Sequence, residues 1–249
     1  MKWLVALFAW SMPLVAWLSS AGIFGPSNGA ISDRYPTLIV AAGYAFSIWG
    51  VIFLLDMIYG TWQLFERGID ARGRALRPFT ALAFALTSAW MIVFSMQLFW
   101  LALAIIWISL ACLWYSAWRL SNSVRHAPAR WWQWAPLSLH AGWVSLAVFL
   151  NFAQVAVAFQ LLPTSQMLPW TLVLFALLAL LLLASLALMR GNPWYAVAVV
   201  WGLVGVYAKQ HTSNLIGAGT AGSIALVLAV VVAAVSAWLL LRNRMSSAA

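Results

Sequence analysis

A helical face that combines a titratable ring, an indole and two amides lies inside one long apolar run of the sequence. Its residues are His140, Trp143, Ala147, Asn151 and Gln154, separated by three or four positions. In an α-helix these spacings place the side chains on one face. Lipid penalises such polar groups, so we expect this face to meet protein or a cavity. A concave aromatic site with a few convergent polar groups is the usual form of a small-molecule pocket.

Two other apolar runs carry faces of a similar kind. One comprises Phe46, Trp49, Phe53, Asp56 and Gly60, and the other comprises Thr80, Ala83, Thr87, Trp90 and Phe94. The chain has 18 tryptophans, and an aromatic belt at the bilayer interfaces accounts for those near the ends of the runs. Tryptophans deeper in the runs need a partner for the indole N–H, because lipid offers none. They therefore either pack between helices or line a cavity.

Three ionisable side chains are candidates for a chemical role. Asp56 is the only acid deep in an apolar run. It is either a ligand counter-charge or proton site, or else a protonated or interhelically hydrogen-bonded group. His140 could serve as an axial haem ligand, although no second histidine lies nearby in the sequence. Lys209 either snorkels to the membrane interface or meets a ligand carboxylate such as a porphyrin propionate.

The elements that must position these residues are membrane-spanning helices. The chain has 249 residues, of which 65% are hydrophobic and 7% charged, whereas a soluble domain carries about a quarter charged residues. Eight apolar segments can be marked, and the charge-free stretch 79–118 is split near residues 95–97 because it is too long for one span. The segments are 3–21, 37–65, 78–95, 98–118, 136–160, 169–189, 194–210 and 222–241. This pattern predicts an all-α, polytopic transmembrane helical bundle of about eight spans.

The basic residues predict how this bundle is oriented. With the N-terminus inside, every inner segment carries Lys or Arg, and only Arg34 and Lys209 of the 13 basic residues fall on the outer side. The inner residues are Lys2, Arg67, Arg72, Arg74, Arg77, Arg119, Arg125, Arg130, Arg190, Arg242 and Arg244. We therefore expect both termini to be cytoplasmic. Because these short loops account for the net charge of +9, we expect no nucleic-acid partner.

Motifs of catalysis and metal binding are absent from the sequence. It contains no HExxH, GxSxG or paired-carboxylate site, and its single cysteine, Cys112, excludes an intrachain disulfide or a cysteine metal cluster. We expect no enzyme activity, no metal and no required cofactor. The first segment could be a cleaved signal peptide, but Trp3, Trp10 and Trp17 are atypical of a signal core.

Three motifs give the chain a family resemblance. They are residues 43–50 (Gly-Tyr-Ala-Phe-Ser-Ile-Trp-Gly), residues 87–90 (Thr-Ser-Ala-Trp) and residues 143–151, where Trp143 and Asn151 stand eight positions apart. These motifs resemble the TspO/MBR family, the tryptophan-rich sensory proteins related to the peripheral benzodiazepine receptor. Residues 31–36 resemble a segment of a longer bacterial branch of that family. So do residues 200–205, which are followed by Lys209. The chain departs from the family pattern at Ala41-Ala42, Thr87 and His140, where Pro-Pro, Asn and Tyr are usual.

The resemblance implies a five-span core over residues 1–160, followed by three additional helices in residues 161–249. It implies a protein of the bacterial cytoplasmic (inner) membrane that binds a hydrophobic or tetrapyrrole-type ligand, such as a porphyrin or haem, in an aromatic intramembrane pocket. The role would be sensory or in transport, and a homodimer is an open alternative. The expected ligand-binding residues are Tyr44, Phe46, Trp49, Asp56, Thr87, Trp90, His140, Trp143 and Asn151.

Two other functions remain open. A secondary transporter would use Asp56 and Lys209 as coupling or substrate charges. A structural or assembly protein would pack its aromatic faces against partner helices. The face that begins at His140 separates these hypotheses, because a cavity wall should be inward and wet, whereas a packing face should be dry and fully contacted.

Overall fold

The computed structural model describes residues 1–65, 69, 71–123 and 131–245, and all regular structure in these residues is helical. Each of the eight apolar segments contains one long helix. The long helices are α1 (Lys2–Ser20), α3 (Ile48–Trp62), α5 (Arg77–Ser95), α6 (Phe99–Ser121), α7 (Trp131–Ala158), α8 (Met167–Leu188), α9 (Pro193–His211) and α10 (Ala218–Met245). The predicted all-α bundle is therefore confirmed, as is the turn between α5 and α6. The inner-side arginines Arg67, Arg125 and Arg130 lie outside the described residues.

Four short elements complete the described part of the chain. They are α2 (Asn28–Arg34), η1 (Gly43–Ser47), η2 (Gln63–Phe65) and α4 (Ala71–Ala75). The expected single segment 37–65 is wrong at its beginning, because residues 37–42 form no helix. The reason is a competing hydrogen bond, in which the N–H of Ala42 donates to the carbonyl of Gly205 on α9 at 2.9 Å.

Among the residues that the structure describes, seven helical segments are long and apolar enough to cross a membrane, and the long helix α9 is not one of them. Its 19 residues would extend about 28 Å, close to the thickness of a bilayer's hydrocarbon core. Its composition is less apolar because Trp194 and Tyr195 occupy its first turn and Lys209 to His211 its last. The protein is thus a multi-pass membrane protein, and α9 is long enough to span but is not one of the seven candidate spans.

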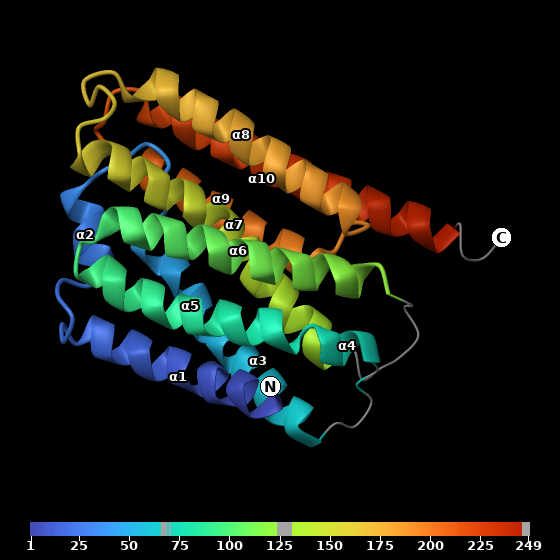
Figure 1. Ribbon diagram of the computed structural model, residues 1–249. Coiled ribbons are helices and arrows are strands. Elements are labelled where there is room, and N and C mark those ends of the chain that lie inside the picture. The colour runs from blue at the N-terminus through green and yellow to red at the C-terminus, as the bar shows by residue number, and fades with distance from the viewer. Residues whose placement is uncertain (66–68, 70, 124–130, 246–249) are drawn as a thin grey trace. The chain divides into compact units, whose positions relative to one another are not determined.

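The helices group into two compact units. The first unit comprises residues 1–31 and 48–141, and the second comprises residues 32–47 and 142–249. In the first unit α1 packs against α3 and α5, and α5 packs against α6; in the second, α10 packs against α8 and α9 (Figure 1). Helix α7 contributes its first part to one unit and its remainder to the other. The division at residue 160 was expected because a five-span family core would end there. Packing within the chain does not test where such a core ends, so this division stays a prediction.

Hydrogen bonds at the two ends of the first unit fix the direction of its helices. At one end, the Gln63 amide donates to the carbonyl of Lys2 at 2.6 Å, and Arg77 donates to the carbonyl of Gln63 at 3.2 Å. At the other end, the hydroxyls of Ser19 and Ser95 lie 2.6 Å apart. Helices α1, α3 and α5 therefore alternate in direction, with Lys2 and Arg77 at the same end.

Candidate functional site

Four aromatic rings of α3 and α5 form a nearly parallel series in the first unit, which we call the aromatic stack. Its order is Phe53, Trp49, Trp90 and Phe94. The ring centroids of successive members lie 5.1, 6.3 and 5.2 Å apart, with interplanar angles of 23°, 28° and 28°. Because the two residues of each helix are spaced by four, helical periodicity alone aligns each pair. The ring contact between Trp49 and Trp90 joins the two pairs. Offset stacking of this kind is a favourable arrangement of aromatic rings.

A series of hydrogen-bonded polar side chains, which we call the polar chain, contacts the stack and links four helices. His140 on α7 contacts Asp56 on α3 through Nδ1 and Oδ2 at 2.8 Å. Its Nε2 lies 3.4 Å from Oγ1 of Thr87 on α5, which in turn lies 3.1 Å from Oγ of Ser109 on α6. All four side chains are buried. The His140 ring also meets the Trp49 ring edge to face, with the centroids 5.6 Å apart, so the polar chain and the aromatic stack are in contact.

The structure therefore brings together five of the nine predicted site residues, namely Trp49, Asp56, Thr87, Trp90 and His140. For Asp56 it realises the alternative of an interhelical hydrogen bond. Both ring nitrogens of His140 have partners, which leaves no nitrogen free to ligate haem iron in this arrangement. In the described residues no group of three or more His, Cys, Asp or Glu could hold a metal ion.

The other four predicted residues belong to the second unit. Phe46 meets the ring of Trp143 edge to face at 5.9 Å, and Tyr44 meets Trp201 in the same way at 5.7 Å. The Asn151 amide donates to the carbonyl of Ala147, one turn earlier in α7, at 3.0 Å. Tyr44 is half-exposed, whereas Trp143 and Asn151 are buried.

The polar face of α7 is buried. His140, Trp143, Asn151 and Gln154 are between 0% and 5% exposed. Such burial agrees with the packing hypothesis for this helix. In the aromatic stack, by contrast, Trp49 is only partly buried, so its ring is the accessible member.

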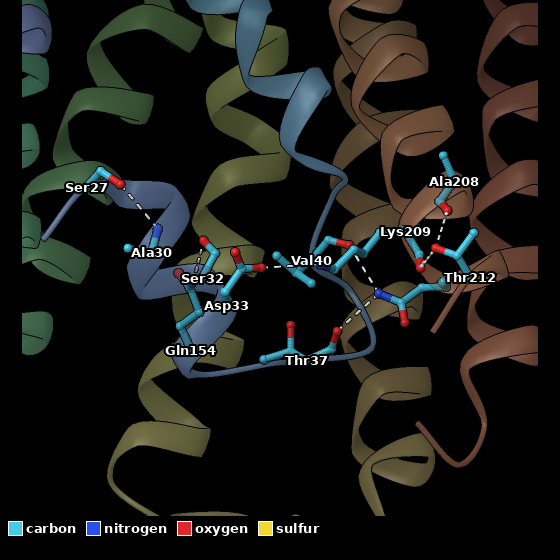
Figure 2. A network of polar contacts seen from close by, with 11 residues as sticks. Ser27, Ala30, Ser32, Asp33, Thr37, Val40, Gln154, Ala208, Lys209 and Thr212 are labelled. Atoms are coloured by element: carbon cyan, nitrogen blue, oxygen red, sulfur yellow. Dashed lines mark hydrogen bonds and ion pairs between the residues drawn. The ribbon is translucent and has the colours of Figure 1, made fainter. Parts of the chain in front are cut away.

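The second unit contains a structural feature that the sequence did not reveal, in which residues 37–45 lie against α9. The Gln210 amide donates to the carbonyls of Thr37 and Val40 at 3.1 and 3.2 Å. The indole N–H of Trp201 donates to the carbonyl of Ala45 at 2.8 Å. Figure 2 shows the irregular part of this segment beside α9. Gln210 was not predicted from the sequence. The signal that could have identified it is an amide at the end of an otherwise apolar run.

Lys209 pairs with an acidic residue that lies far away in the sequence. Its ammonium lies 3.3 Å from Oδ1 of Asp33, and both side chains are substantially exposed (Figure 2). Close by in the sequence, Ser32 accepts a hydrogen bond from the Gln154 amide at 2.9 Å. The two segments that resemble the longer bacterial branch, residues 31–36 and the end of α9, thus meet through this ion pair.

Two cavities lie at helix ends, one in each unit. The cavity of the first unit has a volume of about 200 Å³ and is lined by residues from α6 and its end, with Leu76. The cavity of the second unit has a volume of about 220 Å³ and lies between residues 36–40 and the end of α9. None of the nine predicted site residues lines either of these cavities.

Comparison with known proteins gives one family. The model of a family described as TSPO-like protein matches residues 2–238. No curated protein and no solved structure matches the chain. The family match runs through α8 and α9 and into α10, well beyond the residues 1–160 over which the motifs were recognised. Together with the helical fold and the tryptophan-bearing faces of α3, α5 and α7, this match shows that the chain belongs to the TSPO-like family.

Proposed function

We propose that this TSPO-like membrane protein binds a flat hydrophobic ligand, of which a tetrapyrrole is the leading candidate, against the aromatic stack. The observation that carries the proposal is the near-parallel order of the four rings, with Trp49 accessible. Both faces of Trp49 meet neighbouring rings, so a planar conjugated ligand would contact the exposed part of this indole and would leave lipid for an aromatic surface.

The polar chain behind the stack supports the same proposal. The edge of the His140 ring meets Trp49, and His140 is itself held between Asp56 and Thr87. Holding Trp49 in one orientation before the ligand arrives reduces the entropy that binding must overcome. In this proposal Asp56, Thr87 and His140 position the stack and do not touch the ligand.

The test is a titration of the purified protein in detergent with protoporphyrin IX, followed by quenching of tryptophan fluorescence. We expect Trp49→Leu to weaken binding about tenfold, because an aromatic contact and its buried area are lost. Trp238→Leu is the matched control, since this tryptophan of α10 is 56% exposed and belongs to the second unit. Equal affinity for the wild type and the Trp49→Leu protein would rule out the stack as the site.

A second candidate function, proton-coupled transport, is favoured by the burial of Asp56 and His140 side by side within spans. Ionisable pairs at such depth are a feature of proton relays. Lys209 fits this role less well than we expected, because it forms an exposed ion pair in the other unit. Uptake of porphyrin by proteoliposomes, with and without a proton gradient, separates sensing from transport. Uptake that ignores the gradient and survives Asp56→Asn would eliminate the coupled mechanism.

The cellular setting follows from the same proposal. We infer a lipid-embedded protein of the bacterial inner membrane with both termini cytoplasmic, as the distribution of basic residues predicts. In a Cys112→Ser background, a cysteine inserted directly after Met1 should be protected from a membrane-impermeant maleimide on intact cells, whereas Ser213→Cys should be labelled. Labelling of the inserted N-terminal cysteine, but not of Ser213→Cys, from outside would reverse the orientation.

A further inference from the structure

The cavity at the C-terminal end of α9 has the properties of a second binding site. Its lining combines three residues of the segment 36–40 with five residues at the end of α9 and just beyond it. They are Pro36, Thr37, Val40, Lys209, Gln210, Thr212, Ser213 and Leu215. Its volume of about 220 Å³ is below the range of about 300–1,000 Å³ that holds drug-sized ligands. The site therefore suits a small polar group and is too small for a tetrapyrrole.

Two buried polar atoms of the lining lack a hydrogen-bond partner. Thr37 and Gln210 are 0% and 1% exposed, and neither Oγ1 of Thr37 nor Oε1 of Gln210 is paired. The amide nitrogen of Gln210 is committed to the carbonyls of Thr37 and Val40, which fixes the orientation of its amide and leaves the oxygen available. A buried carbonyl oxygen without a donor is unfavourable. A ligand that brings a hydroxyl would supply that donor and would pair with the Thr37 hydroxyl as well.

The cationic group of the site is the ammonium of Lys209. It has three N–H donors, and the ion pair with Asp33 at 3.3 Å accounts for one of them. Lys209 lines the cavity whereas Asp33 does not, so the positive group is the one presented to a ligand. An anionic group next to one or more hydroxyls is the chemistry that matches this set of side chains.

The position of the cavity along α9 indicates where such a group comes from. The helix is about 28 Å long, so its last turn lies near the boundary between hydrocarbon and headgroups if it crosses the bilayer. Pro36, Val40 and Leu215 provide apolar surface beside the polar atoms. A phospholipid with a glycerol headgroup matches this lining, because it carries apolar chains, then a phosphate and then hydroxyls at this depth of the bilayer.

We propose that this cavity binds a glycerophosphate group, supplied by the headgroup of an anionic glycerophospholipid such as phosphatidylglycerol. Its phosphate accepts hydrogen bonds from Lys209, and its glycerol hydroxyls pair with the Gln210 carbonyl oxygen and the Thr37 hydroxyl. The site lies within the second unit and is independent of the aromatic stack.

The experiment measures lipid binding to the delipidated full chain by native mass spectrometry. Its arms are phosphatidylglycerol, phosphatidylcholine and soluble glycerol 3-phosphate. We expect phosphatidylglycerol to bind about tenfold more tightly than phosphatidylcholine, which has no hydroxyl to donate. If glycerol 3-phosphate competes with the lipid, a soluble phosphate ester is also a source of the glycerophosphate group. If it does not compete, the lipid is the source. Equal binding of both lipids, without binding of glycerol 3-phosphate, would overturn the proposal.

A matched pair of threonine variants locates the site. Thr37→Val removes an unpaired hydroxyl, so it should preserve the fold and weaken binding of phosphatidylglycerol about tenfold. Thr171→Val is the control, because the Thr171 hydroxyl is also buried and unpaired but belongs to α8 and does not line the cavity. Lys209→Met should also weaken binding and reduce its dependence on salt. Wild-type affinity in both Thr37→Val and Lys209→Met would place the lipid elsewhere and refute the assignment.

Discussion

The two units of the molecule bury polar groups for different purposes. In the first unit, Asp56, Thr87, Ser109 and His140 pair with one another between continuous helices. In the second unit, Gln210 and Gly205 pair with the backbone of a non-helical segment. The polar side chains of the first unit contact an aromatic surface through His140. The polar groups of the second unit satisfy the backbone of a non-helical segment within a membrane protein.

The difference teaches how a chain with few charged residues distributes its polar atoms. Non-helical backbone at membrane depth is tolerated only where protein or a water-filled cavity satisfies its N–H and C=O groups. The second unit meets this requirement with one amide side chain and with a glycine that lets the segment approach α9. The polar side chains of the first unit pair with one another and contact the aromatic stack through His140.

The largest expected effect breaks the polar chain of the first unit. Asp56→Ala removes the partner of His140 Nδ1 and leaves a buried imidazole nitrogen unpaired, which should lower the free energy of unfolding by about 3 kcal/mol. Unfolding in mixed detergent micelles measures the change. Asp56→Asn keeps a hydrogen-bonding side chain and should lose less. Wild-type stability of the alanine variant would show that the pair does not order this unit.

Gly205→Leu tests the close approach in the second unit. A Cβ at this position would lie 2.5 Å from Cβ of Ala45 and 3.3 Å from that of Ala41. We expect overpacking to lower the free energy of unfolding by about 2–3 kcal/mol, observed as a lower midpoint of thermal unfolding. Gly219→Leu is the control, since nothing lies within 4 Å of a Cβ there. Similar losses at both glycines would mean that the segment does not depend on Gly205.

Gln210→Met tests the amide that holds the same segment. The variant leaves the carbonyls of Thr37 and Val40 without their donor, and we expect a loss of about 1–2 kcal/mol. The backbone amide of Ala42 should also exchange its hydrogen faster, because the segment is released from α9. Unchanged exchange at Ala42 in this variant would contradict the role assigned to Gln210.

The smallest effect concerns the exposed ion pair of Lys209 and Asp33. Lys209→Met should change the free energy of unfolding by less than about 0.5 kcal/mol, because solvent screens an exposed pair. The midpoint of thermal unfolding at low and high salt is the measurement. A large, salt-sensitive loss would show that the pair anchors residues 31–36 to α9 more strongly than its exposure indicates.

Much of the fold could be predicted from the sequence, since long apolar runs can satisfy their backbone in lipid only as helices. The aromatic stack was predictable in part, because periodicity places Trp49 and Phe53, or Trp90 and Phe94, on one face. The pairing of Asp56 with His140 spans 84 positions, and periodicity gives no information on which faces meet. Residues 37–42 were predicted as helix because local composition is apolar, whereas a distant carbonyl on α9 decides their conformation.

The central claim is that a flat hydrophobic ligand binds at the aromatic stack of the first unit and not at the second unit. The direct measurement is titration of the Soret band of protoporphyrin IX with the wild type, Trp49→Leu and Trp201→Leu in nanodiscs. Trp201 is the matched residue, because it is also a partly exposed aromatic of a helix, at 39%, and it lies in the second unit. We predict about tenfold weaker binding for Trp49→Leu and little change for Trp201→Leu. Loss of affinity in Trp201→Leu alone, or in neither variant, would contradict the account.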